Sequence, residues 1–192
     1  CRITVFTVFR QVRIQRIRIR RMGFSCLRPS HKLMPIHIDD RRSSCRPPAE
    51  KIRRILSRAM RHLGCARDEL SVLLVTDREM RSLNRTHRGK NRPTDILSFG
   101  MRDRRGRRDP LPPHPGVLGD LVVSTDSVAR LAAGRNADAD AALAETLVHG
   151  LLHLLGYGHA GSLEAERMYA LQAALAAQCQ TPPRRRGRVS SR

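Results

Sequence analysis

The chain has 192 residues, a formal charge of +20, five cysteines and only 3% aromatic residues. Its length suits one domain, and because no apolar run approaches the roughly 18 residues that cross a bilayer, we expect a soluble protein without a membrane partner. The odd cysteine count and the lack of a CxxC pair argue against a disulfide framework and a thiolate zinc site, which favours a cytoplasmic setting. The charge favours a polyanion such as RNA, and the scarcity of aromatic rings means that RNA contacts must rely on charge and a metal.

The two ends of the chain are its most basic parts. Residues 1–33 contain nine Lys or Arg, residues 181–192 contain five, and neither segment contains an acid. The leader lacks the apolar centre of a secretory signal, so it is either a mitochondrial transit peptide or upstream sequence translated before a true start at Met34, and we favour the second interpretation. We therefore predict a basic leader over 1–33, one domain over 34–180 and a disordered basic tail over 181–192.

The first half of this domain predicts strands separated by helices. A short strand is expected over 35–38, ending in acidic turn residues. Apolar residues recur at helical spacing from 52 to 63, and Gly64 can close that helix. The run LSVLLV at 70–75 predicts the second strand.

The middle of the chain combines a polar helix with a long basic loop. Asp77 is expected to cap a helix that carries Met80 and ends near Gly89. A strand over 96–99 follows, and then a loop over 100–117. This loop holds five arginines, Arg102, Arg104, Arg105, Arg107 and Arg108.

The second half predicts one further strand and three helices. The strand covers 118–124, and either Thr125 or Asp126 caps the helix after it. Asp138 or Asp140 begins the run AALAETLVHGLLHLLG, which is apolar on nearly all sides and is therefore expected to form a buried central helix. The last helix covers 162–178. These elements predict an α+β fold in which five to six helices pack on a small mixed four-stranded sheet.

Three histidines have the spacing of a metal site. His149 and His153 are four residues apart on the central helix, so their imidazoles project from one face. Gly156 lets the chain leave the helix sharply and return His159 to the same point. Three imidazoles leave one position of a tetrahedral ion open, which is typical of a catalytic site that hydrolyses its substrate. We predict one Zn²⁺ ion bound by His149, His153 and His159.

The same HxxxHxxGxxH spacing occurs in metzincin proteases. Those enzymes carry a glutamate directly after the first histidine, where it acts as the general base. Gly150 occupies that position here and has no side chain that could transfer a proton. A metzincin-like metallopeptidase is therefore the weakest of the functions that we consider.

Four segments together resemble a known family. HGLLHLLGYGH at 149–159 is similar to the signature HGxLHLxGYDH of the YbeY family of endoribonucleases and rRNA maturation factors. NRTHRGKNRPTDILSF at 84–99 resembles the family's Asn, Tyr-Arg-Gly-Lys and Thr-Asp-Val-Leu-Ser-Phe segment. The segments 118–124 and 34–42 resemble its Leu-Gly-Asp-Ile strand and its first strand.

The resemblance implies further site residues. It points to Arg88 as a catalytic residue beside His149, since a fixed guanidinium can stabilise the negative charge that builds up during phosphodiester cleavage. Lys90 would contact backbone phosphates. Two positions depart from the family: Gly158 stands where the family has Asp, and His87 stands where it usually has an aromatic residue. We expect Glu145 to form a surface ion pair and the exposed His114 to bind no metal.

The resemblance also implies the biological role. We expect a metal-dependent, single-strand-specific endoribonuclease that acts in late small-subunit rRNA 3′ end processing and in ribosome quality control. Its expected partners are single-stranded rRNA, the small ribosomal subunit, ribosomal proteins and an assembly GTPase. The alternative is a non-catalytic ribosome-assembly factor that a structural zinc ion stabilises.

Overall fold

The computed structural model describes residues 36–42, 47–100, 116–159 and 161–180. The chain divides into two units, residues 1–32 and 33–192, and all described residues belong to the second unit. The predictions for the leader, the arginine-rich loop, His114 and the tail lie outside the described residues.

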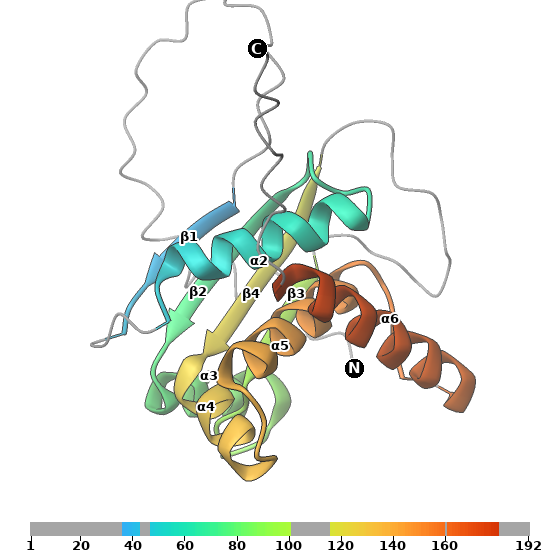
Figure 1. The fold of residues 1–192 in the computed structure, drawn as a ribbon. Helices are drawn as coiled ribbons and strands as arrows, with labels where there is room; N and C mark the ends of the chain where they lie inside the picture. Colours follow the sequence, from blue (N-terminus) through green and yellow to red (C-terminus); the bar gives the residue numbers. More distant parts are fainter. Residues whose placement is uncertain (1–35, 43–46, 101–115, 160, 181–192) are drawn as a thin grey trace, which may run out of the picture. The chain divides into compact units, whose positions relative to one another are not determined.

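Nine elements follow one another in the described part of the chain (Figure 1). Strands and helices alternate up to the third strand, two strands are then consecutive, and three helices complete the unit. The elements are β1 (Ile36–Asp40), α2 (Ala49–His62), β2 (Glu69–Val75), α3 (Asp77–Arg88), β3 (Ile96–Gly100), β4 (Val117–Ser124), α4 (Thr125–Gly134), α5 (Ala139–Leu154) and α6 (Ser162–Gln180). The predicted α+β class, with four strands and five to six helices, is confirmed.

The four strands form one mixed sheet in the order β1-β2-β4-β3. β1, β2 and β4 are parallel, and β3 pairs with β4 in the antiparallel sense. The strand β1 is longer than predicted, because its pairing with β2 continues through Asp39 and Asp40. Those two acidic residues are therefore part of the strand and not of a turn.

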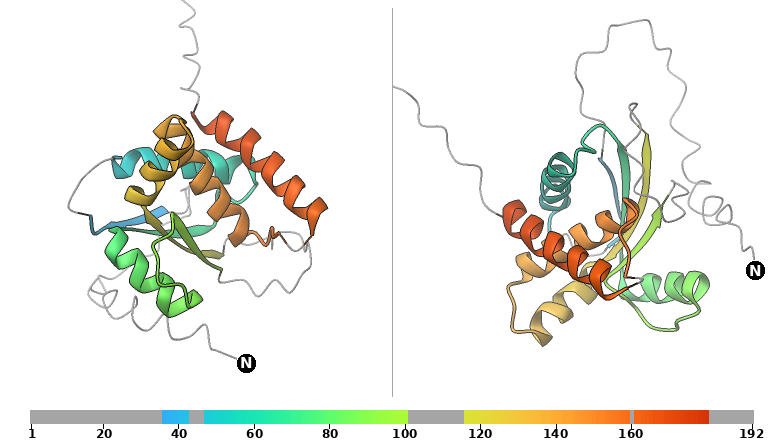
Figure 2. Two further views of the ribbon diagram at one scale, coloured as in Figure 1. Left: turned by 90° about the horizontal axis from the view of Figure 1, so that it is seen from below. Right: turned by 90° about the vertical axis from the view of Figure 1, so that its right-hand side faces the viewer.

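The two faces of the sheet are covered unequally. On one face, α2, α4, α5 and α6 pack against Leu70, Val72, Leu74 and other inward residues in one large apolar core. On the other face, α3 is the one described helix, and it packs through Met80 against a small group. Figure 2, right, shows α3 on the side opposite α2 and α6. The small group consists of Val75, Leu97 and Val122, with Leu73, Leu83 and Phe99 at its margin.

The helix ends explain why the helices start where they do. The predicted cap of α3 is wrong by one residue: Thr76 and not Asp77 caps the helix, because the Thr76 hydroxyl accepts from the Glu79 amide and Glu79 reaches back to Thr76. The next helix, α4, is capped by Ser124, so neither predicted residue is its cap. Asp138 caps α5 as predicted, with its carboxylate 2.9 Å from the Ala141 amide.

Three methionines serve packing, since Met60, Met80 and Met168 are buried in the core. Among the described helices, none combines the length and the apolar character that a membrane span requires.

Candidate metal centre

The C-terminal half of α5 and the turn after it bring the three predicted histidines together. His149 and His153 lie one turn apart, with their Nε2 atoms 3.1 Å apart. The ring of His159 lies 5.4 Å from that of His149 and 5.0 Å from that of His153, measured between ring centroids. The possible ligand atoms of all three side chains lie within 4.8 Å of one another. Within the described residues this is the group of His, Cys, Asp and Glu side chains that could hold a metal ion.

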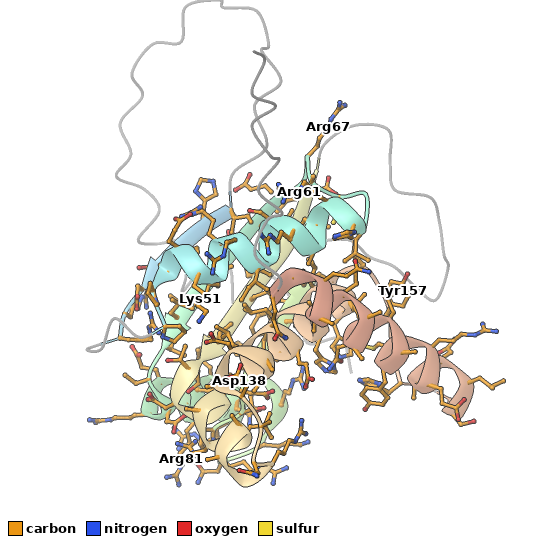
Figure 3. The ribbon with its side chains drawn as sticks, viewed as in Figure 1. Lys51, Arg61, Arg67, Arg81, Asp138 and Tyr157 are labelled. Carbon is orange, nitrogen blue, oxygen red and sulfur yellow. The ribbon has the colours of Figure 1, made fainter. Side chains whose placement is uncertain are left out.

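The turn that returns His159 is built by backbone hydrogen bonds. The Gly156 amide donates to the His153 carbonyl at 3.0 Å and the Tyr157 amide donates to the Leu152 carbonyl at 3.1 Å. Gly156 has a φ of +89°, in the left-handed region that favours glycine. Tyr157 lies just beyond the end of α5 (Figure 3), and its carbonyl oxygen points back to the helix.

The Nδ1 atoms of His149 and His153 each contact an acceptor oxygen. Nδ1 of His153 lies 3.0 Å from the Tyr157 carbonyl oxygen, and because a carbonyl can only accept, this nitrogen carries a hydrogen. Nδ1 of His149 lies 2.9 Å from Oε1 of Gln172 on α6, which accepts in the same way. Both neutral rings therefore present a lone pair at Nε2, the form in which imidazole binds a metal.

The Nε2 atoms of His149 and His153 fit a shared cation better than a shared proton. A hydrogen bond between them would require one ring to become an imidazolium, since each Nδ1 atom already carries a hydrogen. For His153 this is unfavourable, because burial, the neighbouring His149 and His159 and the charge of Arg88 lower its pKa, against the effect of the Tyr157 carbonyl. The observed 3.1 Å between the Nε2 atoms is close to the about 3.3 Å expected between two nitrogens bound to a tetrahedral zinc ion.

His159 is held by an aromatic ring of α6. Its imidazole stacks on the ring of Tyr169, with 5.2 Å between centroids and 23° between the planes. His159 is exposed, whereas His149 and His153 are half-buried. The Tyr169 contact therefore limits the orientation of the exposed His159 ring.

Gly150, which follows the first histidine of the group, lies against the sheet. A Cβ atom at this position would lie 2.3 Å from Cδ1 of Ile96 and 3.0 Å from Cδ2 of Leu121. The helix α5 therefore packs closely on β3 and β4, and a side chain at this position would require those of Ile96 and Leu121 to move. The position holds glycine and not the glutamate that a metzincin protease needs here.

Arg88 lies within electrostatic reach of His153. It is the last residue of α3, and its charge is one cause of the lowered pKa of His153. The preceding His87 packs edge to face on Phe99 of β3 with ring centroids 5.2 Å apart, and burial lowers its pKa. The candidate metal-binding group of the described residues consists of His149, His153 and His159, and His87 lies outside it. His87 fixes the end of α3 on β3 in the place of the family's aromatic residue.

Hydrogen bonds hold the segment after α3 in place. Asn84 is buried and its Nδ2 donates to the Arg92 carbonyl at 2.7 Å. The Thr94 hydroxyl donates to Asp95 Oδ1 at 3.0 Å, and the Asp95 carbonyl accepts from the Ser124 amide at 2.9 Å. These contacts give Asp95 a structural role.

Two further positions near the ligands were singled out from the sequence. Gly158 adjoins His159, and nothing lies within 4 Å of a Cβ atom built there. Among the described residues, no neighbouring group occupies the space that the family's Asp side chain would begin to fill. Glu145 lies one turn before His149 and is half-buried. The structure places no ion pair on it within the described residues, so the predicted surface ion pair is absent there.

Sequence reasoning missed Gln172 and Tyr169, the two α6 residues that contact the ligands. They are three residues apart and therefore share one face of α6. A Gln and a Tyr in an Ala-rich amphipathic helix carry no spacing signal for a metal site. Only the packing of α6 along α5 brings them to it.

Three comparisons with known proteins agree with this geometry. A family model described as endoribonuclease YbeY matches residues 37–180. A protein of Syntrophotalea carbinolica named endoribonuclease YbeY is 35% identical over 142 residues, covering 73% of this chain and 92% of the relative. One of an Anaeromyxobacter species with the same name is 40% identical over 144 residues, covering 74% and 71%. The solution structure of a Thermotoga maritima protein is similar with a TM-score of 0.55 and 25% identity, covering 76% of this chain and 89% of that one.

Proposed function

The chain belongs to the endoribonuclease YbeY family, and from this premise we propose that it is a metal-dependent endoribonuclease that cleaves single-stranded RNA during rRNA maturation. The observation that carries the proposal is the convergence of the His149 and His153 Nε2 lone pairs, with His159 beside them and Arg88 within electrostatic reach.

The bound ion that we propose is one zinc ion. His149, His153 and His159 would hold it, each through a neutral imidazole nitrogen. When bound, a divalent cation supplies a Lewis acid for a phosphate oxygen or a water molecule. Imidazole ligands also suit nickel and copper, so the choice of zinc rests on the expected tetrahedral geometry with one open position.

The residues of the chain divide the remaining chemistry. Arg88 would stabilise the negative charge that develops on the phosphate, because a guanidinium remains charged throughout the physiological range. Lys90, two residues later and exposed, would contact a neighbouring phosphate. Gln172 and the Tyr157 carbonyl hold the imidazoles in the tautomer that leaves Nε2 free.

The biological setting of this activity is part of the proposal. The proposed substrate is the 3′ region of small-subunit rRNA in the cytoplasm, with a further role in ribosome quality control. The proposed partners are the small subunit, its proteins and an assembly GTPase. The domain that acts is the segment 34–180.

Cleavage of a labelled single-stranded RNA by the purified protein tests the proposal. We expect cleavage that is lost in His149→Ala and on chelation, and that returns when zinc is added to the chelated wild type. His62→Ala is the matched control, because His62 is an exposed histidine on α2 outside the metal-binding group. Cleavage that survives both His149→Ala and chelation would overturn the mechanism.

A second candidate, the non-catalytic assembly factor with a structural metal, draws its support from Gly158. If this position needs an acid for catalysis, the chain would bind metal without cleaving RNA. Metal content and melting temperature distinguish the two functions. A wild type that binds zinc, melts far lower without it and never cleaves RNA would favour the assembly factor.

A further inference from the structure

The exposed side of α3 carries a row of four arginines, of which the proposed chemistry uses only Arg88. Arg78, Arg81, Arg85 and Arg88 follow one another at intervals of three, four and three residues. At 3.6 residues a turn, these positions fall within about 80° of arc and extend over about 15 Å of the helix. All four side chains are exposed, whereas Met80 and Asn84 on the adjacent face are buried. We call these four residues the α3 arginine row.

The acids near this row are engaged with other groups. Asp77 accepts from the hydroxyls of Ser124 and Ser127, each at 2.6 Å, and pairs with Arg130 of α4. Glu79 is held by the amide and hydroxyl of Thr76.

The arginines of the row have few partners of their own. Across the described segments, no acidic side chain pairs with Arg78, Arg85 or Arg88. Arg81 donates from Nε to Asn91 Oδ1 at 3.0 Å, which orients its guanidinium and leaves both terminal nitrogens available. The row therefore presents positive charge that the described residues do not neutralise.

The other basic helix, α2, differs in this respect. Arg53 donates to the Ile36 carbonyl, Arg58 donates to the Cys179 carbonyl at 3.0 Å, and Lys51 pairs with Asp140 of α5. These bases hold α2 against its neighbours. On α2 only Arg54 and Arg61 are exposed arginines, whereas all four arginines of the α3 row are exposed.

One end of the row lies at the candidate metal centre. Arg88 is both the last member of the row and the residue whose charge acts on His153. The contact of His87 with Phe99 and the burial of Met80 fix the rotation of α3 on the sheet, so the row cannot turn away from solvent. The row therefore stays exposed and ends at Arg88, the residue whose charge acts on the candidate metal centre.

We propose that the α3 arginine row binds the phosphate backbone of the single-stranded RNA on one side of the cleavage site. This inference rests on the proposed function. Guanidinium groups bind phosphate oxygens bidentately, and exposed arginines in a row can contact successive phosphates. At the 3.4 Å per nucleotide of a stacked strand, the row would contact about four nucleotides leading away from the metal centre.

Salt-dependent binding measures these phosphate contacts directly. The variant is Arg78→Gln/Arg85→Gln, which leaves Arg88 intact, and the matched control is Arg54→Gln/Arg61→Gln on α2. Arg54 and Arg61 are also exposed, and the control removes the same charge. Figure 3 shows Arg61 in the upper part of the view, on α2, and Arg81 at the lower left. The probe is a fluorescein-labelled oligouridylate of about 12 nucleotides, titrated by anisotropy at several KCl concentrations.

We expect Arg78→Gln/Arg85→Gln to reduce the slope of log affinity against log salt by about 1.4, since each phosphate contact on a single strand contributes about 0.7. The affinity should fall about tenfold at low salt, while the cleavage rate at saturating RNA and the melting temperature stay unchanged. Arg78→Lys/Arg85→Lys should restore most of the slope, because lysine also binds phosphate as a point charge. The α2 control should keep the wild-type slope.

Equal losses in the α2 control and the α3 variant, or no loss in either, would overturn the proposal. If the wild type cleaves RNA but Arg78→Gln/Arg85→Gln binds RNA as tightly as the wild type, the α3 arginine row does not bind the substrate and the nuclease function stands. If the wild type binds RNA with the predicted dependence on Arg78 and Arg85 but never cleaves it, RNA binding by the α3 arginine row stands and the nuclease function fails.

Discussion

The amide oxygen of Gln172 lies 2.9 Å from Nδ1 of His149 and joins α6 to the helix that carries the metal ligands. The contact sets the tautomer of His149, since a ring that donates from Nδ1 must offer a lone pair at Nε2. Three residues earlier on α6, Tyr169 stacks on His159. One face of α6 thus orients two of the three ligands.

Replacing Gln172 should weaken metal binding without unfolding the protein. We expect Gln172→Met, which keeps the length and removes the acceptor, to lower zinc affinity about 10–100-fold, as is typical when the partner of a ligating histidine is lost. Gln172→Glu should keep or raise the affinity, because a carboxylate can only accept. Competition with a chromophoric chelator measures this without reference to activity.

The control for this experiment is Gln178→Met, since Gln178 is exposed on the same helix. Loss of affinity in Gln178→Met as well would indicate a general effect on α6. Unchanged affinity in Gln172→Met would show that the contact with His149 does not position the ligand.

Restoring the family's acid should be possible at Gly158. Nothing lies within 4 Å of a Cβ atom at this position, so Gly158→Asp is expected to fold with an unchanged melting temperature. A carboxylate beside His159 could orient that ligand or move a proton, so we expect cleavage to become up to about tenfold faster. Gly161→Asp, also open in space, is the control. A Gly158→Asp protein with wild-type rate and metal affinity would show that the acid is dispensable in this chain.

Gly150→Ala should destabilise the fold. The added methyl would lie 2.3 Å from Cδ1 of Ile96, so either the buried Ile96 side chain or α5 must move. We expect a loss of about 1–3 kcal/mol in the free energy of unfolding, the usual cost of an overpacked core. Urea denaturation measures the change, and Gly134→Ala is the control, because Gly134 at the end of α4 has open space around it. Equal stability of the two variants would contradict the close approach of α5 to β3.

Asp77 should make stability depend on acid pH. Burial alone would raise the pKa of Asp77, but its hydrogen bonds with Arg130, Ser124 and Ser127 outweigh this and lower the pKa from 3.8 to about 2. Because the folded-state pKa is depressed, the contribution of Asp77 is fully present above the unfolded value and is lost as pH falls through about 2. We expect Asp77→Asn to lower the melting temperature by a few degrees near pH 6 and to match the wild type near pH 2.

The control for this pH dependence is Asp126→Asn. Asp126 is an exposed acid in the first turn of α4, near Arg130 but outside the serine hydrogen bonds. A difference between Asp77→Asn and the wild type that stays constant from pH 6 to pH 2 would contradict the assigned role of Asp77.

Much of the fold could be predicted because the relevant signals are local. The helical spacing from Ile52 to Leu63 and the apolar run of α5 follow from which side chains must leave water, and this depends on neighbours along the chain. The predicted cap of α3 is wrong by one residue, because Thr76 and Asp77 are both good caps and only the hydrogen bond from Thr76 to the Glu79 side chain decides between them. The strand β1 was predicted too short, because its last residues are held by pairing with β2, which the sequence does not show.

The sequence by itself determined which histidines form the candidate metal-binding group. A spacing of four residues fixes His149 and His153 on one helical face, and Gly156 permits the turn to His159, so short-range geometry suffices. The tertiary structure alone decided what surrounds them. Gln172 and Tyr169 reach the ligands because α6 packs along α5, Gly150 lies against the sheet because α5 approaches β3 closely, and Arg88 lies near His153 from α3 on the other face of the sheet. Each of these relations joins residues distant in sequence through packing, and no pattern along the chain encodes which faces will meet.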